Sequence, residues 1–259
     1  MIPYEDISNV DRTKAVVSAT EIMEKGWTRR QYPLISLNDP IPWAMRNQQE
    51  RSWNFHIHCW DMVDSLLKAY SETQEKQFVL PAIRVAEDWA EKHSNLSQAD
   101  MSPLAWYDMA VGLRAYRLAY IIDAGKGAGL LDQDLRNKLW ASLEQHQAYL
   151  ADDKNIQFQN NHGYYQVVGQ LAMGRRFAGE SPLMAQALEQ GKERLKAMLT
   201  QQFAKDGVHR EHSPDYHRMV YDTLKSMIDS RLVEEAETIA FAETIEKALS
   251  WFVLPSQHI

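Results

Sequence analysis

The sequence predicts an all-α protein made of stacked αα-hairpins. Apolar residues recur three or four positions apart along most of the 259 residues, and the segments with this spacing are separated by short connections. Only YPLISL (32–37) has the character of an extended segment, and Asn38-Asp39-Pro40 closes it. Stacked hairpins form either an open solenoid or a closed toroid, and because no strict repeat is visible, the sequence leaves both curvatures open.

The predicted helices follow one another closely. The first has Asp11 as its N-cap and ends at Gly26, and the next two run from about His56 to Tyr70 and from about Gln77 to Lys92. About nine helices result, and with no linker or low-complexity segment visible, residues 1–259 are expected to form one domain. The later helix faces are marked by Met109, Leu113, Tyr116 and Tyr120; by Leu135, Leu139, Leu143 and Leu150; by Leu188, Gly191, Leu195 and Met198; and by Ile239, Ala242, Ile245, Leu249 and Phe252.

Serine–proline pairs predict three of the helix starts. A serine at the N-cap accepts a hydrogen bond from a free backbone N–H, and a proline at the first helical position has no N–H to satisfy. We therefore expect a helix to begin at each of the pairs Ser102-Pro103, Ser181-Pro182 and Ser213-Pro214.

Composition narrows the class of protein. Hydrophobic residues make up 45% and charged residues 24%, as in ordinary globular proteins, and no apolar run approaches the roughly 18–20 residues that span a bilayer. The formal net charge of -7 argues against broad nucleic-acid binding, although a local cluster of arginines, histidines and amides could still bind an anion. The single cysteine, Cys59, cannot form an intrachain disulfide and is expected to be a buried thiol.

Two polar clusters could carry chemistry. The first, QNNHGYYQ (159–166), places amides beside an imidazole, which suits either a polar helix cap or a site that binds a carboxylate or a sugar. In the second, DGVHREHSPDYHRMV (206–220), Ser213 is expected to cap a helix whose first turn contains Tyr216. The positive helix N-terminus would favour the phenolate of Tyr216, so this tyrosine could accept and return a proton; a half-buried structural tyrosine is the alternative.

Other kinds of active site have less support. His56 and His58 are two residues apart, and His209 and His212 are three apart, so neither pair forms the H-E-x-x-H arrangement that holds zinc on a helix. The sequence contains no cysteine pair, no G-x-S-x-G nucleophile motif and no glycine-rich phosphate loop. We therefore expect no metal site and no cofactor in this chain.

Four blocks follow one another along the chain: ERSWNFHIHCWD (50–61), WYDMAVGLRAYRLAY (106–120), NNHGYY (160–165) and EHSPDYH (211–217). Together they resemble the heparinase II/III-like polysaccharide lyases and the related alginate and oligoalginate lyases. The resemblance implies an (α/α) toroid followed by an antiparallel β-sandwich that supplies further active-site groups and could hold a metal. This chain would then be an incomplete toroid that lacks the β-sandwich, with weak activity or none by itself.

The resemblance also implies a reaction, the β-elimination of a uronic-acid-containing acidic glycan such as heparin or heparan sulfate. Asn161 would neutralise the uronate carboxylate, with Tyr216 and His162 as base and acid. If both proton transfers occur on one face of the sugar, Tyr216 could perform both; if they occur on opposite faces, His162 could be the base and Tyr216 the acid. The alternatives are an alginate-type polyuronate lyase and a non-catalytic or truncated helical domain that binds glycan.

Further residues within the resembling blocks are predicted to bind substrate. Arg51 could pair with a carboxylate or sulfate, and Trp53 and Trp106 could stack on sugar rings. For each of these residues a structural role is the alternative. The other predicted binding residues are His58, Asp108, His212 and Arg218, and Asn54 and Arg114 are further polar positions in the blocks.

The expected partner is therefore an acidic polysaccharide or oligosaccharide, with no nucleic acid and no membrane. If a second domain normally covers the cleft, this chain alone would expose an apolar patch and should self-associate. The resemblance implies a periplasmic or secreted protein.

Overall fold

The fold is all-α, as predicted. The computed structural model describes residues 2–7, 11–29, 32–43, 51–93, 102, 104–211 and 213–250. Within these ranges the β structure consists of two isolated antiparallel bridges, Trp27 with Ile35 and Phe203 with His209, so YPLISL contributes one bridge and no regular strand. The α-helices are α1 (Ala15–Lys25), α2 (Arg51–Cys59), α3 (Asp64–Thr73), α4 (Lys76–His93), α5 (Asp108–Ala128), α6 (Gln133–Ala151), α7 (His162–Phe177), α8 (Pro182–Gln202), α9 (Pro214–Asp229) and α10 (Ala236–Leu249).

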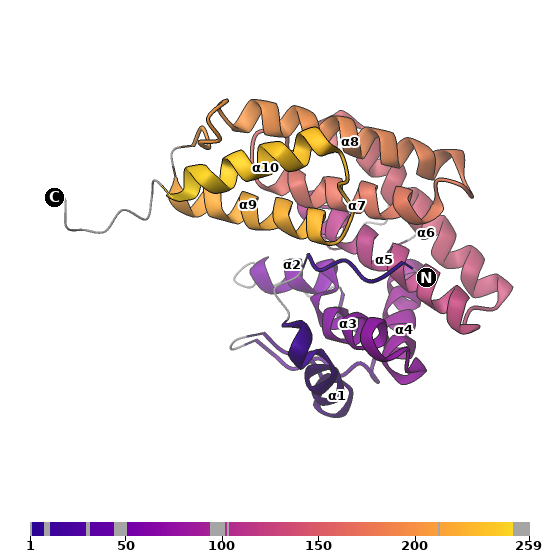
Figure 1. The fold of residues 1–259 in the computed structure, drawn as a ribbon. Helices are drawn as coiled ribbons and strands as arrows, with labels where there is room; N and C mark the ends of the chain where they lie inside the picture. The colour runs from indigo at the N-terminus through magenta and orange to yellow at the C-terminus, as the bar shows by residue number, and fades with distance from the viewer. Residues whose placement is uncertain are drawn as a thin grey trace, which may run out of the picture.

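From α3 onward the helices form hairpins that stack in two layers (Figure 1). Along the chain α3 packs on α4, α5 on α6, α7 on α8 and α9 on α10. The odd-numbered helices also pack in sequence, α3 on α5, α5 on α7 and α7 on α9, while α4 packs on α6 and α6 on α8. This two-layered arc of hairpins is an incomplete (α/α) toroid, as predicted.

Glycine at the centre lets α5 and α7 approach closely. A Cβ atom on Gly112 of α5 would lie 2.2 Å from the carbonyl oxygen of Tyr165, and one on Gly169 of α7 would lie 2.7 Å from the carbonyl oxygen of Gly112. Any larger side chain would push the two helices apart. The two helices run parallel in this contact, so their N-termini lie side by side.

Residues 2–7, here called the N-terminal segment, cross between the α1–α4 part and the α7–α10 part of the molecule (Figure 1). Arg176 of α7 donates to two backbone carbonyls of the segment, each at 3.0 Å, and the hydroxyl of Tyr4 donates to Asp64 of α3 at 2.5 Å. A backbone N–H near the end of the segment donates to the hydroxyl of Ser230, after α9, at 2.9 Å. The segment thereby ties three helices together.

Most predicted helix boundaries are close to those observed. Asp11 caps a short 3₁₀ turn that leads into α1, and Gly26, with a φ of 93°, ends that helix. Pro182 and Pro214 are the first residues of α8 and α9. Among the described residues, no helix is long and apolar enough to span a membrane.

Two predicted elements need correction. The single helix expected from His56 to Tyr70 is two helices, because Trp60 adopts a left-handed conformation (φ 65°) that ends α2 before the 3₁₀ turn η3 (Asp61–Val63). No helix begins at Ser102, whose hydroxyl accepts from the backbone N–H of Leu104 at 3.3 Å within a turn, and α5 begins at residue 108. The proline of that pair, residue 103, lies outside the described residues.

Candidate active site

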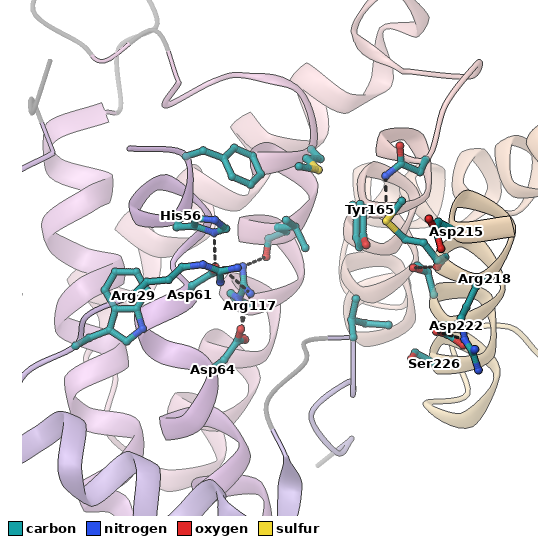
Figure 2. Close-up of a pocket in the computed structure, with 18 of the residues that line it drawn as sticks. Arg29, His56, Asp61, Asp64, Arg117, Tyr165, Asp215, Arg218, Asp222 and Ser226 are labelled. Carbon is teal, nitrogen blue, oxygen red and sulfur yellow. Dashed lines mark hydrogen bonds and ion pairs between the residues drawn. The ribbon is translucent and has the colours of Figure 1, made fainter. Parts of the chain in front are cut away.

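A groove of about 730 Å³ runs between the α2–α3 side of the molecule and α9 (Figure 2). Its volume falls within the range of pockets that take small ligands or a few sugar rings. Arg29, His56 and Asp61 form one wall, and Asp215, Arg218 and Asp222 of α9 form the opposite wall. The start of α7 lies between the walls, where Asn161 and Tyr165 line the groove.

Ion pairs fix the wall next to α2. Asp61 accepts from His56 Nδ1 at 2.7 Å and contacts Arg117 at 3.1 Å and Arg29 at 3.4 Å. Arg117 also forms two hydrogen bonds to Asp64, at 2.6 and 2.9 Å. Burial acts to raise the pKa of Asp61, but the hydrogen bond from His56 and the charge of Arg117 outweigh it and lower the pKa. The side chains of this wall are therefore linked by ion pairs and close to charge balance.

The starts of α7 and α9 meet at the groove. The amide Nδ2 of Asn161 lies 3.6 Å from the sulfur of Met219, in the second turn of α9. Tyr216 stands three residues before Met219 in α9 and is 45% exposed. Of the three predicted catalytic residues, Asn161 lines the groove, whereas His162 and Tyr216 lie outside its lining. Ser213 caps α9 as predicted, since its hydroxyl accepts from the Tyr216 backbone N–H at 3.4 Å.

The cap of α7 comes from Asn160. Its side-chain oxygen accepts from the His162 backbone N–H at 2.9 Å, as expected for a helix cap. The side chain of Asn161 makes no cap hydrogen bond, which leaves its amide directed at the groove and α9.

His162 is held by Asp108 at the paired N-termini of α5 and α7. The His162 Nδ1 and Asp108 Oδ2 atoms are 2.5 Å apart. The Asp108 side chain is 7% exposed and that of His162 is 36% exposed. The hydrogen bond to Asp108 raises the pKa of His162, and partial burial opposes the rise. Asp108, predicted to bind substrate, instead contacts another candidate site residue.

Three predicted binding residues have exposed or half-buried side chains. Arg218 lines the groove and points largely into solvent. Arg51 donates to the Tyr107 hydroxyl at 3.1 Å on the surface. Trp106 is half-buried, with its ring 4.9 Å from that of His146. His212, the remaining candidate of this kind, lies outside the described residues.

Trp53 and His58 are core residues, so the prediction that they contact substrate needs correction. Trp53 is fully buried, and stacking contacts with Trp27 and Tyr32 at 4.9 and 5.1 Å between ring centres occupy it. His58 is also fully buried, and its Nε2 donates to the Trp43 carbonyl at 3.2 Å. Burial lowers the pKa of His58 and keeps the ring neutral.

The polar positions Asn54 and Arg114 are likewise structural. Asn54 is buried in α2, and Arg114 has no exposed surface. Arg114 donates to the carbonyls of His58 and Ala105, both at 2.7 Å, and so holds the turn before α5. Its guanidinium lies 3.9 Å from the ring centre of Trp89, a cation–π contact that replaces a carboxylate partner.

Sequence reasoning missed several residues that line the groove. His56 was considered only as a metal ligand, although it lies in a resembling block, and Arg29 lies in no block. Tyr165 belongs to NNHGYY, and Asp215 to EHSPDYH. The motif letters alone cannot tell which members of a block face the groove. The described residues contain no group of three or more metal-ligating side chains.

Comparison with known proteins identifies the family. The profile of the family described as heparinase II/III N-terminus matches residues 3–256, so the chain belongs to this family. Among solved structures it is similar to the heparan sulfate lyase HepC from Pedobacter heparinus, with 19% identity and a TM-score of 0.72 over 96% of this chain and 40% of that one. It is also similar to heparinase III, the BT4657 gene product, with 13% identity and a TM-score of 0.65 over 95% of this chain and 42% of that one.

These likenesses concern the fold. The chain spans about two fifths of the length of the solved structures that it resembles. No protein of curated function matches it.

Proposed function

We propose that the protein containing this chain is a polysaccharide lyase that cleaves a uronic-acid-containing glycan of the heparin or heparan sulfate type. Membership of the heparinase II/III N-terminal family and similarity to structures named as heparan sulfate lyases support this class. The observation that carries the proposal is the meeting of two helix starts at the groove. Asn161 and His162 open α7, and Tyr216 lies one turn from the α9 residue that Asn161 contacts.

In the proposed reaction, the amide of Asn161 and the imidazole of His162 bind the uronate carboxylate. A proton leaves C5, the C4–O4 bond breaks, and a C4–C5 double bond forms while O4 is protonated. Hydrogen bonds to the carboxylate stabilise the negative charge that develops on it as the C5 proton departs. The helix N-termini behind these residues favour an anion at the same place.

Tyr216 is the proposed proton carrier. If base and acid act on one face of the sugar, Tyr216 accepts the C5 proton and returns it to O4. If they act on opposite faces, His162 is the base and Tyr216 the acid. Both arrangements require the hydroxyl of Tyr216, so its removal tests the shared part of the mechanism.

The direct test is the ultraviolet absorbance of the unsaturated uronate, measured when the full protein that contains this chain acts on heparan sulfate, heparin and alginate. We expect product from the first two. Product from alginate alone would move the substrate class to polyuronates, and binding without product from any of the three would favour a glycan-binding domain. This chain alone should be weakly active or inactive, since elimination needs donors on both sides of the sugar and exclusion of water.

Tyr216→Phe should lower turnover by roughly 10²–10⁴, the usual contribution of a general acid or base, with little change in folding. Tyr221→Phe is the matched control, because this tyrosine lies in the same helix but is buried, facing Glu246 of α10. Near-normal turnover of Tyr216→Phe in an active protein would exclude Tyr216 from the mechanism.

A further inference from the structure

Asp108 and His162 are hydrogen-bonded to each other, and their side chains differ sharply in exposure to solvent. The carboxylate is almost fully buried, whereas the imidazole reaches solvent. The 2.5 Å contact joins Nδ1 to Oδ2, and no described residue forms a hydrogen bond to the other ring nitrogen, Nε2. The second carboxylate oxygen, Oδ1, is buried without a hydrogen-bond partner among the described residues. The carboxylate therefore has His162 as its side-chain partner.

The fold constrains Asp108 from both sides. Asp108 has a φ of 48°, a left-handed conformation that aspartate tolerates better than most residues. Earlier in the chain, Arg114 donates a hydrogen bond to the carbonyl of Ala105 at 2.7 Å. Later in the chain, Gly112 allows α5 to pack against Tyr165 of α7. A strained backbone of this kind persists only where the surrounding structure holds it in place.

We propose that Asp108 is a positioning residue that binds Nδ1–H of His162 and leaves Nε2 as the nitrogen that meets the substrate. In this arrangement Nε2 donates to the uronate carboxylate, as Asn161 does, when the ring is protonated, and accepts the C5 proton when the ring is neutral. This inference rests on the proposed lyase function for its substrate, whereas the geometry of the pair does not.

Electrostatics favours the protonated form of the His162 ring. A buried carboxylate with a single side-chain partner stabilises the protonated imidazole, and the pKa of His162 is raised accordingly. A protonated ring carries hydrogen on both nitrogens, so Nε2 can donate but cannot accept the C5 proton. The other titratable group near Asp108 is Tyr149 of α6, whose pKa is raised mainly by burial and also by the charge of Asp108.

The first test needs no variant. Nitrogen-15 chemical shifts of the His162 ring, followed through a pH titration of the unmodified protein, report which nitrogen keeps the proton in the neutral form. We expect the proton on Nδ1, the less common tautomer. A neutral form with its proton on Nε2 would overturn the proposal.

The second test uses Asp108→Asn. Its loss of charge should move the titration midpoint of His162 to lower pH. Asp222→Asn is the matched control, because it removes a groove carboxylate whose contact is with Arg218 at 3.9 Å, and it should leave the midpoint unchanged. An unchanged midpoint in folded Asp108→Asn would also overturn the proposal.

The pH profile of turnover separates positioning from a merely structural role. If His162 must be protonated, activity falls as pH rises through its pKa, and the alkaline limb should shift to lower pH in Asp108→Asn. If Asp108→Asn lowers turnover equally at every pH and leaves the alkaline limb in place, Asp108 has only a structural role. If the activity of the unmodified protein instead increases as pH rises through the His162 pKa, His162 is the base. If the full protein that contains this chain cleaves none of the three glycans, the proposed function fails, while the ring measurements still decide the role of Asp108.

Discussion

Asn160 and Asn161 are neighbours at the start of α7 with different partners. The Asn160 side chain caps the helix, and the Asn161 amide reaches the groove and Met219 of α9. The two asparagines therefore allow the effect of a lost helix cap to be separated from the effect of a lost substrate contact.

Asn161→Ala should lower kcat more than it raises KM, because the charge that this amide meets grows in the transition state. Asn160→Ala, the matched comparison, should lower the free energy of unfolding by about 1 kcal/mol through loss of the cap, with a smaller effect on kcat. Steady-state kinetics and denaturant unfolding of both variants provide the measurements. A rise in KM alone for Asn161→Ala would make Asn161 an ordinary binding residue.

For single residues, the sequence predicted which side chains would form the site better than it predicted where each side chain would point. The motifs singled out Asn161, His162 and Tyr216, which all belong to the starts of α7 and α9, and of the three Asn161 lines the groove. It could not place Trp53, since an aromatic residue at helical spacing packs equally well into a core or under a sugar. Nor could it predict the role of Asp108, whose partner lies 54 residues away and is brought near only by the packing of α5 on α7.

The site depends on the contact between helices α5 and α7. Its glycines allow the two helices to lie close enough for Asp108 to reach His162. A change in helix separation should therefore affect both stability and catalysis.

Gly112→Ala should destabilise the protein by about 1–3 kcal/mol, because its Cβ would overlap the backbone of α7. Gly127→Ala is the control in the same helix. It has no atom within 4 Å of the added Cβ and should stabilise the protein by up to about 1 kcal/mol through helix propensity. Urea unfolding of both variants measures the change in the free energy of unfolding. Equal changes in the two variants would show that the α5–α7 contact can adjust freely.

Helix boundaries show where local signals suffice. Gly26 ends a helix, and the prolines at residues 182 and 214 each begin one, because their backbone conformations favour these positions. These boundaries were predicted correctly. Trp60 breaks the second predicted helix without such a signal, because a left-handed tryptophan is dictated by its buried surroundings and not by its own preference. The toroidal curvature was likewise not visible in local pattern, since it depends on how hairpins pack on one another.

For the whole molecule, the N-terminal segment is the tie between the two sides of the groove. Its Glu5 forms an ion pair with Arg176 at 2.6 Å, and both side chains are fully buried. Ile7, at the end of the segment, lines the groove itself. The position of the segment therefore influences the separation of the walls.

Arg176→Ala should cost about 3–5 kcal/mol of unfolding free energy, because it leaves Glu5 buried without its charge partner. Lys126→Ala, which removes an exposed ion pair with Glu180, should cost no more than about 1 kcal/mol. Thermal or denaturant unfolding compares the two. Equal, small losses would mean that the segment can detach without consequence for the rest of the fold.

The near balance of charge in the groove has a consequence for the conditions in which it can bind. Its described lining carries three arginines and four aspartates: Arg29, Arg117, Arg218, Asp61, Asp64, Asp215 and Asp222. A polyanion held there would be retained by directed hydrogen bonds more than by bulk attraction, so few counterions would be displaced when it binds. The contribution of this groove to affinity should therefore persist in media of high ionic strength, where proteins that rely on a basic surface release their glycans.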